Sequence, residues 1–144
     1  MSWLWRDGEL RSADGTTLAV AQRTTLYCDR EEMLLEPSTT GAFRLRGTTS
    51  DGDIYYLRQA GLTNTKLEID CAGTAYRAER IKPLRRARRI FRVADGAEVL
   101  HTEPRLRGCE LDVTQVESTL PLVDAAFITW GCVLTDAPET EIRI

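Results

Sequence analysis

Apolar and polar residues alternate with a period of two along much of the chain. The clearest runs are residues 66–70 (KLEID) and 110–113 (ELDV), and Phe43 and Leu45 alternate with arginines in the same way. This pattern is typical of β-strands that bury one face and expose the other, as in antiparallel sheets. It predicts a protein built mainly from short antiparallel strands.

The dipeptide Asp-Gly occurs four times, at residues 7–8, 14–15, 51–52 and 95–96. Asp-Gly between strand-like arms is a strong local signal for a β-hairpin, because both residues tolerate the positive φ angles of a type I′ turn. The sequence Ala-Gly-Thr at residues 72–74 is a further candidate turn. These turns predict a meander of hairpins.

The arms of the hairpins and the runs between them give ten to twelve candidate strands. They lie around Trp3, Trp5 and Leu10 and at residues 16–22, 32–37, 42–47, 53–59, 65–71, 74–80, 89–93, 97–103 and 109–116. No Ser/Gly-rich linker or shift in composition separates them. We therefore predict that residues 1–144 form a single domain.

The longest apolar run, at residues 122–134 (LVDAAFITWGCVL), departs from this alternation. Ser118 or Thr119 can cap a helix there, with Pro121 in its first turn and Asp124 near the positive end of the helix dipole. Residues 136–138 (DAP) are a plausible end of the helix. The run therefore predicts a helix near the C-terminus.

Apolar residues cover every face of this predicted helix, so either protein or lipid must surround it. Its length of about 20 Å, at ~1.5 Å per residue, is short of the ~30 Å hydrocarbon core of a membrane. The small residues Ala125, Ala126 and Gly131 would let strands approach closely. We predict a core helix inside a curved sheet, with Phe127, Ile128 and Trp130 buried; a buried strand is the alternative.

The chain resembles a known family loosely over most of its length and most specifically at about residues 88–136. Residues 91–104 (FRVADGAEVLHTEP) match a late hairpin, and residues 109–136 match a last strand that leads into a core helix. In this order the chain resembles the tubby C-terminal-like superfamily, which includes phospholipid scramblases and LURP-one-related proteins. The resemblance implies a closed barrel of about twelve strands around a hydrophobic helix. A lipocalin-like or other antiparallel barrel is the alternative, and it would normally lack the internal helix.

One segment of the chain is strongly basic. Residues 77–92 contain eight basic residues and one acidic residue, although the formal net charge of the chain is −3. Guanidinium groups form paired hydrogen bonds with phosphate groups, so we interpret the segment as a candidate site for an anionic ligand. The candidate residues are Lys82, Arg85, Arg86, Arg88, Arg89 and Arg92. A solvated surface without a ligand is the alternative.

Two kinds of partner fit such a site: anionic phospholipid headgroups and an acidic face of another protein. The resemblance favours lipid, because tubby domains of animals bind phosphoinositides through basic residues. Nucleic-acid binding is not expected, since the rest of the chain is acidic and carries no RNA-binding or helix-turn-helix signature. We predict a non-enzymatic binding module, with a protein-interaction or adaptor domain as the alternative.

No catalytic residue, metal site or cofactor is predicted. His101 is the single histidine, and Cys28, Cys71, Cys109 and Cys132 are too widely spaced for a zinc-binding pattern. Phosphate-binding, dinucleotide-binding and nucleophile-elbow motifs are missing from the sequence. The sequence shows neither a secretory signal nor an apolar run of the ~18 residues that suggest a transmembrane helix. Reduced thiols and a cytoplasmic location are therefore expected, with peripheral membrane association if the ligand is lipid.

Overall fold

A computed structural model describes residues 1–38, 40–106 and 109–137. Within them the elements are β1 (Ser2–Arg6), β2 (Glu9–Ser12), β3 (Thr17–Gln22), β4 (Thr25–Cys28), β5 (Glu31–Ser38), β6 (Arg44–Thr49), β7 (Ile54–Gln59), β8 (Lys66–Cys71), β9 (Thr74–Arg80), β10 (Arg88–Arg92), β11 (Glu98–Pro104), β12 (Leu111–Gln115) and α1 (Leu122–Asp136). This order, strands first and one helix last, is the predicted one.

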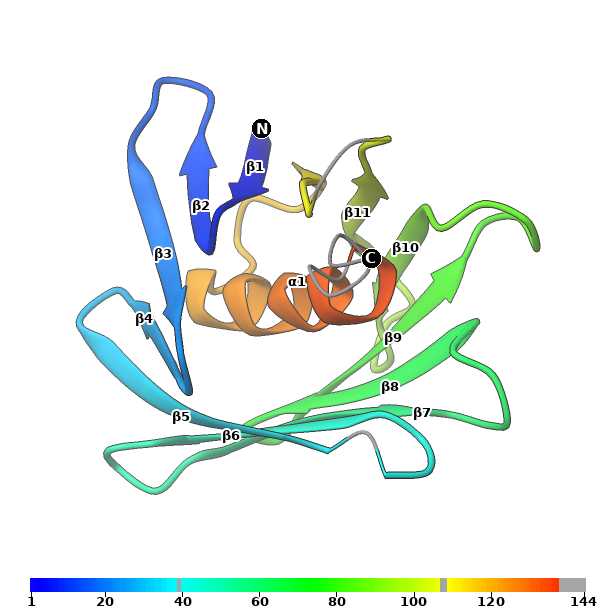
Figure 1. Ribbon diagram of the computed structural model, residues 1–144, viewed down its shortest axis with the longest axis horizontal. Helices are drawn as coiled ribbons and strands as arrows, with labels where there is room; N and C mark the ends of the chain where they lie inside the picture. The colour runs from blue at the N-terminus through cyan, green and yellow to red at the C-terminus, as the bar shows by residue number, and fades with distance from the viewer. Residues whose placement is uncertain (39, 107–108, 138–144) are drawn as a thin grey trace, which may run out of the picture.

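The twelve strands form a closed antiparallel barrel (Figure 1). Each strand pairs with its neighbours in sequence, and β1 also pairs with β12, where Trp3 lies opposite Val113. The buried residues of the strands and of α1 form one hydrophobic cluster. The predicted fold class, a mainly β antiparallel barrel with a helix near the C-terminus, is confirmed.

All four Asp-Gly dipeptides lie in hairpin connections, but only one has the predicted turn geometry. At Asp7 and Gly8 both φ angles are positive, 52° and 77°. At residues 14–15, 51–52 and 95–96 only the glycine has a positive φ, and these connections are longer than two residues. Longer hairpin loops commonly combine a type I turn with a left-handed residue, which accounts for the difference.

Strand β4 is the one that the sequence did not reveal. It is four residues long, and turns without glycine flank it. Asp29 and Arg30 both take positive φ angles, 54° and 68°, and Arg23 takes 57°. Arginine is not a residue that marks such turns, and Asp29 without a following glycine is only a weak turn signal, so these two hairpins are not recognisable from the sequence.

The helix begins close to the predicted position but is capped differently. Pro121 occupies the cap position with ψ 136°, and no side chain caps the helix. Neither Ser118 nor Thr119 fills that role, and the Thr119 hydroxyl instead donates to Glu117 at 3.1 Å. The predicted end is confirmed, since α1 ends at Asp136; the proline at position 138 lies outside the described residues.

Helix α1 is buried between strands from several sides of the barrel, with contacts to β3, β4, β7, β11 and β12 (Figure 1). Phe127 is fully buried and meets the ring of Tyr55 edge-on at 5.5 Å. Gly131 lets the helix approach β7 closely, because a Cβ at this position would collide with the Leu57 side chain. The sequence prediction of a core helix is therefore correct for the side of α1 that carries Phe127 and Gly131.

Trp130 departs from the predicted burial. It is only partly buried, and its ring lies 5.1 Å from that of Trp5 on β1. The indole N–H of Trp5 donates to the Thr129 hydroxyl at 2.7 Å, and that hydroxyl donates to the Ala125 carbonyl, also at 2.7 Å. These bonds satisfy the buried polar groups of this face.

One buried carboxyl lies in the first turn of α1. The Tyr76 hydroxyl of β9 donates to Asp124 Oδ2 at 2.6 Å. Burial raises the pKa of Asp124 above its ordinary value, and the hydrogen bond from Tyr76 partly opposes this shift. Burial and the same hydrogen bond raise the pKa of Tyr76, so the phenol stays protonated and remains the donor.

The raised pKa of Asp124 predicts a pH dependence of stability. The folded state holds this proton more tightly than the unfolded chain, so its contribution is fully present below about pH 4 and is lost as the pH rises through the folded-state pKa. The Asp124→Asn variant keeps an acceptor for Tyr76 but cannot ionise. Urea unfolding should therefore show the variant gaining stability relative to wild type as the pH rises from 4. Parallel pH profiles would contradict this expectation.

Connections in an antiparallel meander alternate between the two ends of the barrel. We call the end of the barrel at which α1 ends the C-end. There Asp136, the last residue of α1, bonds to Arg80 of β9 and Arg88 of β10. The described connections at the C-end are residues 7–8, 23–24, 40–43, 60–65, 81–87, 105–106 and 109–110. The other end is the N-end, where α1 begins; its connections are residues 13–16, 29–30, 50–53, 72–73, 93–97 and 116–121.

Candidate functional site

The predicted basic cluster does not form one patch, because β10 carries its arginines from the C-end to the N-end. Arg92 lies near the N-end and forms ion pairs with Asp95, at 2.9 Å, and with Glu117. Arg89 points outward from the barrel wall, with Nε 4.0 Å from a carboxylate oxygen of Glu98. Of the six predicted residues, only Lys82, Arg85 and Arg86, which precede β10, lie together at the C-end.

The prediction that Arg88 binds a ligand is wrong, because its side chain is fully buried. Its Nε and Nη2 donate to the two carboxylate oxygens of Asp136 at 2.6 and 2.9 Å, and Nη2 also donates to the Asn64 carbonyl at 2.6 Å. Burial alone would lower the pKa of Arg88, but its bonds to Asp136 contribute to a net rise, so the guanidinium stays charged. A buried, fully engaged cation of this kind supports the fold.

Asp136 gathers three arginines around the C-terminal end of α1. Besides Arg88, Arg80 of β9 donates to Oδ1 at 3.0 Å, and Arg86 donates to the Asp136 backbone carbonyl at 2.9 Å. The last carbonyls of a helix lack partners and carry the negative end of its dipole, so cations are stabilising there. The sequence suggested only that the helix ends near Asp136, and it gave no sign of these partners.

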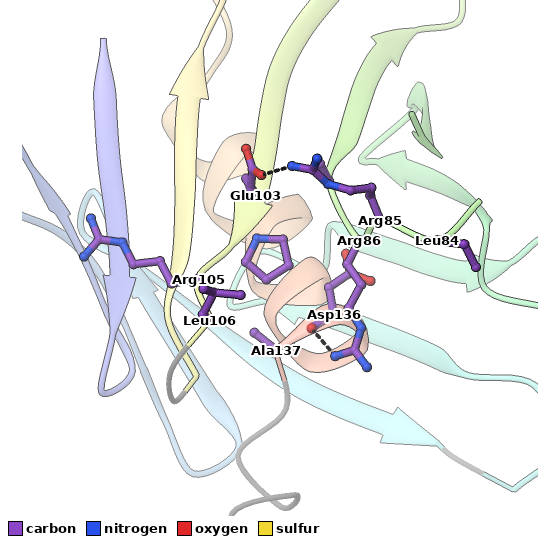
Figure 2. A pocket seen from close by; sticks show the side chains of 10 residues that line it. Leu84, Arg85, Arg86, Glu103, Arg105, Leu106, Asp136 and Ala137 are labelled. Atoms are coloured by element: carbon purple, nitrogen blue, oxygen red, sulfur yellow. Dashed lines mark hydrogen bonds and ion pairs between the residues drawn. The ribbon is translucent and has the colours of Figure 1, made fainter. Parts of the chain in front are cut away.

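A pocket of about 420 Å³ opens beside this arginine cluster (Figure 2). Its lining residues are Leu84, Arg85, Arg86, Ala87, Glu103, Pro104, Arg105, Leu106, Asp136 and Ala137. Arg85 and Arg86 are predicted site residues that the structure places here, whereas Glu103, Arg105 and Asp136 are new. The lining carries both signs of charge, so the pocket itself is not a simple anion site.

Arg85 is held only loosely. Its Nη2 lies 2.9 Å from Glu103 Oε2 across the pocket (Figure 2), and both side chains are well exposed. An exposed ion pair of this kind is worth about 0–1 kcal/mol, so Arg85 can exchange Glu103 for another anion at little cost. Lys82, in the same connection, makes no ion pair with any described residue.

The barrel has a basic end and an acidic end. Among the described residues, the C-end connections contain five basic and two acidic residues: Arg23, Lys82, Arg85, Arg86 and Arg105 against Asp7 and Glu110. Those of the N-end contain six acidic residues and one basic residue: Asp14, Asp29, Asp51, Asp53, Asp95 and Glu117 against Arg30. The fold thus turns a charge distribution scattered along the chain into a dipole along the barrel.

The described part of the chain offers little chemistry beyond this charge. Its His, Cys, Asp and Glu side chains form no group of three or more that could hold a metal ion. Burial raises the pKa of the Cys28 and Cys132 thiols to about 12, which makes both poor nucleophiles at neutral pH. No described helix has the length and apolar character needed to span a bilayer.

Comparison with protein-family models, with curated proteins and with solved structures finds no match for this chain. The tubby-like relationship therefore stays a prediction from the sequence pattern. The candidate site that emerges is the C-end of the barrel, with Lys82, Arg85, Arg86 and Arg105 around the C-terminal end of α1.

Proposed function

We propose that this protein is a non-enzymatic binding module of the tubby-like type, whose C-end docks on anionic lipid headgroups. The observation that carries the proposal is the opposition of charge between the two ends of the barrel. A basic end attracts a negatively charged membrane, while an acidic end is repelled by it, so the same charge distribution both binds and orients the molecule.

The residues that would make the contact are Lys82, Arg85 and Arg105. Lys82 has no ion-pair partner among the described residues, and Arg85 has one exposed partner, Glu103. Arg105 is about half-exposed and pairs with Asp112 through two bonds of 3.0 Å and with the half-buried Glu110 at 3.4 Å. Each basic residue near an anionic membrane surface contributes about 1 kcal/mol of attraction, and salt screens this attraction. The proposed binding is therefore modest for each residue, additive and sensitive to salt.

A protein-interaction domain is the second candidate function, and the outer face of β4 and β5 supports it. Tyr27 and Leu34 project from these neighbouring strands and are exposed, although both are large and apolar. Exposed aromatic and aliphatic side chains on adjacent strands are typical of contact surfaces. If this face binds a partner, Tyr27→Ala/Leu34→Ala should lose it in a pull-down, whereas Arg30→Ala should not.

The lipid proposal predicts a specific loss of vesicle binding. Lys82→Ala/Arg85→Ala should lower the affinity for vesicles of phosphatidylcholine with phosphatidylserine by roughly 30-fold at low salt, because two attractions of about 1 kcal/mol are removed. The measurement is sedimentation with vesicles across a salt series, with pure phosphatidylcholine as the neutral comparison.

The control is Arg30→Ala, which removes from the N-end an exposed cation that makes no ion pair with any described residue. It should bind as tightly as wild type. A loss of about fivefold in Arg30→Ala, the value expected for one charge of about 1 kcal/mol, would mean that only net charge matters. Failure of the wild-type protein to bind anionic vesicles would refute the lipid proposal.

A further inference from the structure

Three leucine side chains at the C-end are fully exposed to solvent. Leu62, Leu84 and Leu106 are 101%, 98% and 105% exposed, and they lie in the connections after β7, β9 and β11. Elsewhere in the described chain the most exposed large apolar residue is the terminal Met1, at 80%, and the rest do not exceed 52%. A single exposed leucine is ordinary, but three at successive connections of one end form a pattern that calls for a partner.

Two of these leucines, Leu62 and Leu84, lie in connections that hydrogen bonds anchor to the end of α1. Arg88 ties residues 60–65 to the helix end through its bond to the Asn64 carbonyl, and Arg86 ties residues 81–87 to it through the Asp136 carbonyl. The connections after β7 and β9 project beyond the C-terminal end of α1 (Figure 1), and Leu84 and Leu106 lie on opposite sides of the pocket (Figure 2).

Basic residues flank the apolar tips. Lys82 and Arg85 lie on either side of Leu84 in sequence, and Arg105 precedes Leu106. An exposed apolar side chain flanked by basic residues matches the layers of an anionic bilayer, in which the phosphate groups lie at the surface and the hydrocarbon lies beneath them. Protein interfaces are enriched in aromatic residues and arginine and depleted in lysine. These three connections contain no aromatic residue, and Lys82 lies beside the tip at Leu84. The composition thus favours a lipid surface as the occupant.

We propose that Leu62, Leu84 and Leu106 enter the acyl-chain region of an anionic membrane, while Lys82, Arg85 and Arg105 lie at the level of the phosphates. This inference rests on the proposed lipid-binding function and adds to it an apolar component, a defined depth and an orientation. In this pose the acidic N-end faces away from the membrane, and the C-terminal end of α1 faces it.

The test compares vesicle binding of Leu62→Ser/Leu84→Ser/Leu106→Ser with that of a matched control, Ile54→Ser/Val93→Ser/Val116→Ser. The control residues are about half-exposed and lie at the N-end, in its connections or, for Ile54, at the adjoining start of β7. We expect the C-end variant to lose about 1,000-fold or more in affinity for phosphatidylserine-containing vesicles, since burying each of the three leucines contributes at least about tenfold. Its residual binding should vanish at high salt, whereas the control should bind as wild type does.

A second measurement reports depth directly. In a Cys109→Ser background, Leu84→Cys and Val93→Cys are each labelled with a bimane fluorophore and mixed with vesicles whose acyl chains carry nitroxide groups. Quenching at position 84 without quenching at position 93 is the expected result. Absence of quenching at position 84 in vesicle-bound protein would overturn insertion.

The outcomes separate this inference from the function on which it rests. Salt-sensitive vesicle binding that the three serines leave unchanged would overturn insertion and leave electrostatic docking in place. Failure of the wild-type protein to bind anionic vesicles would overturn both proposals. Self-association in solution that the three serines abolish, without vesicle binding, would assign the leucines to a protein contact instead.

Discussion

Phe127→Asp is expected to prevent folding. Phe127 is fully buried in the middle of α1, where its ring packs edge-on against Tyr55 and approaches Gly47 so closely that a Cβ there would lie 3.1 Å from it. Losing a buried phenylalanine costs about 3–5 kcal/mol, and an unpaired buried charge costs several more. Because a domain of this size has a total stability of roughly 5–15 kcal/mol, little or no folded protein should remain.

The measurement is the yield of soluble protein and the presence of a cooperative thermal transition by circular dichroism. Leu84→Asp is the control, since it places the same charge on a fully exposed leucine and should fold like wild type. Ile128→Asp should behave like Phe127→Asp, because Ile128 is equally buried. A cooperatively folded Phe127→Asp variant would show that α1 is not the core of the barrel.

Arg88→Met should lower the free energy of unfolding by about 3–5 kcal/mol. The substitution removes the bidentate hydrogen bonds that Arg88 donates to the buried Asp136 carboxylate, and it removes the bond that Arg88 donates to the Asn64 carbonyl. Breaking one partner of a buried ion pair is strongly destabilising, because the remaining charge stays out of water. Urea unfolding monitored by tryptophan fluorescence measures the loss.

Two comparisons define the origin of that loss. Arg88→Met/Asp136→Leu removes both charges of this pair and should recover part of the stability, since replacing a buried pair by apolar residues is often tolerated. The recovery is incomplete because Arg80 also loses its 3.0 Å bond to Asp136. Arg46→Ala breaks the exposed 2.9 Å pair with Glu36 and should cost no more than about 1 kcal/mol. A loss below about 1 kcal/mol for Arg88→Met would mean that Arg80, which also bonds Asp136 Oδ1, or water compensates the remaining carboxylate.

The two roles of the basic segment can therefore be separated by mutation. Arg88 holds the connection at residues 60–65 and the end of α1 in place, so its substitution should disturb stability first and binding indirectly. Lys82 and Arg85 hold nothing buried, so their substitution should change vesicle binding and leave the free energy of unfolding nearly unchanged. Measuring both quantities on both variants distinguishes a structural cation from a ligand-binding one.

Local sequence pattern determined most of the fold. Alternation of apolar and charged residues and the Asp-Gly turns marked every strand except β4, because a half-buried strand and a tight turn each have a signature within a few residues. The helix was predictable because a run that is apolar on all faces must be enclosed. Strand β4 was missed because it is short and its flanking turns contain no glycine.

The candidate site depended on long-range placement that no local pattern contains. The sequence showed that residues 77–92 are basic, but one strand within them carries Arg88 into the core, Arg89 outward and Arg92 toward the opposite end. The partner of Arg88 is 48 residues away, and the acidic N-end is assembled from separate connections along the chain. Local sequence determined the strands, turns and core helix of this protein, whereas only the closure of the barrel decided which charges are buried, which are paired and which share a surface.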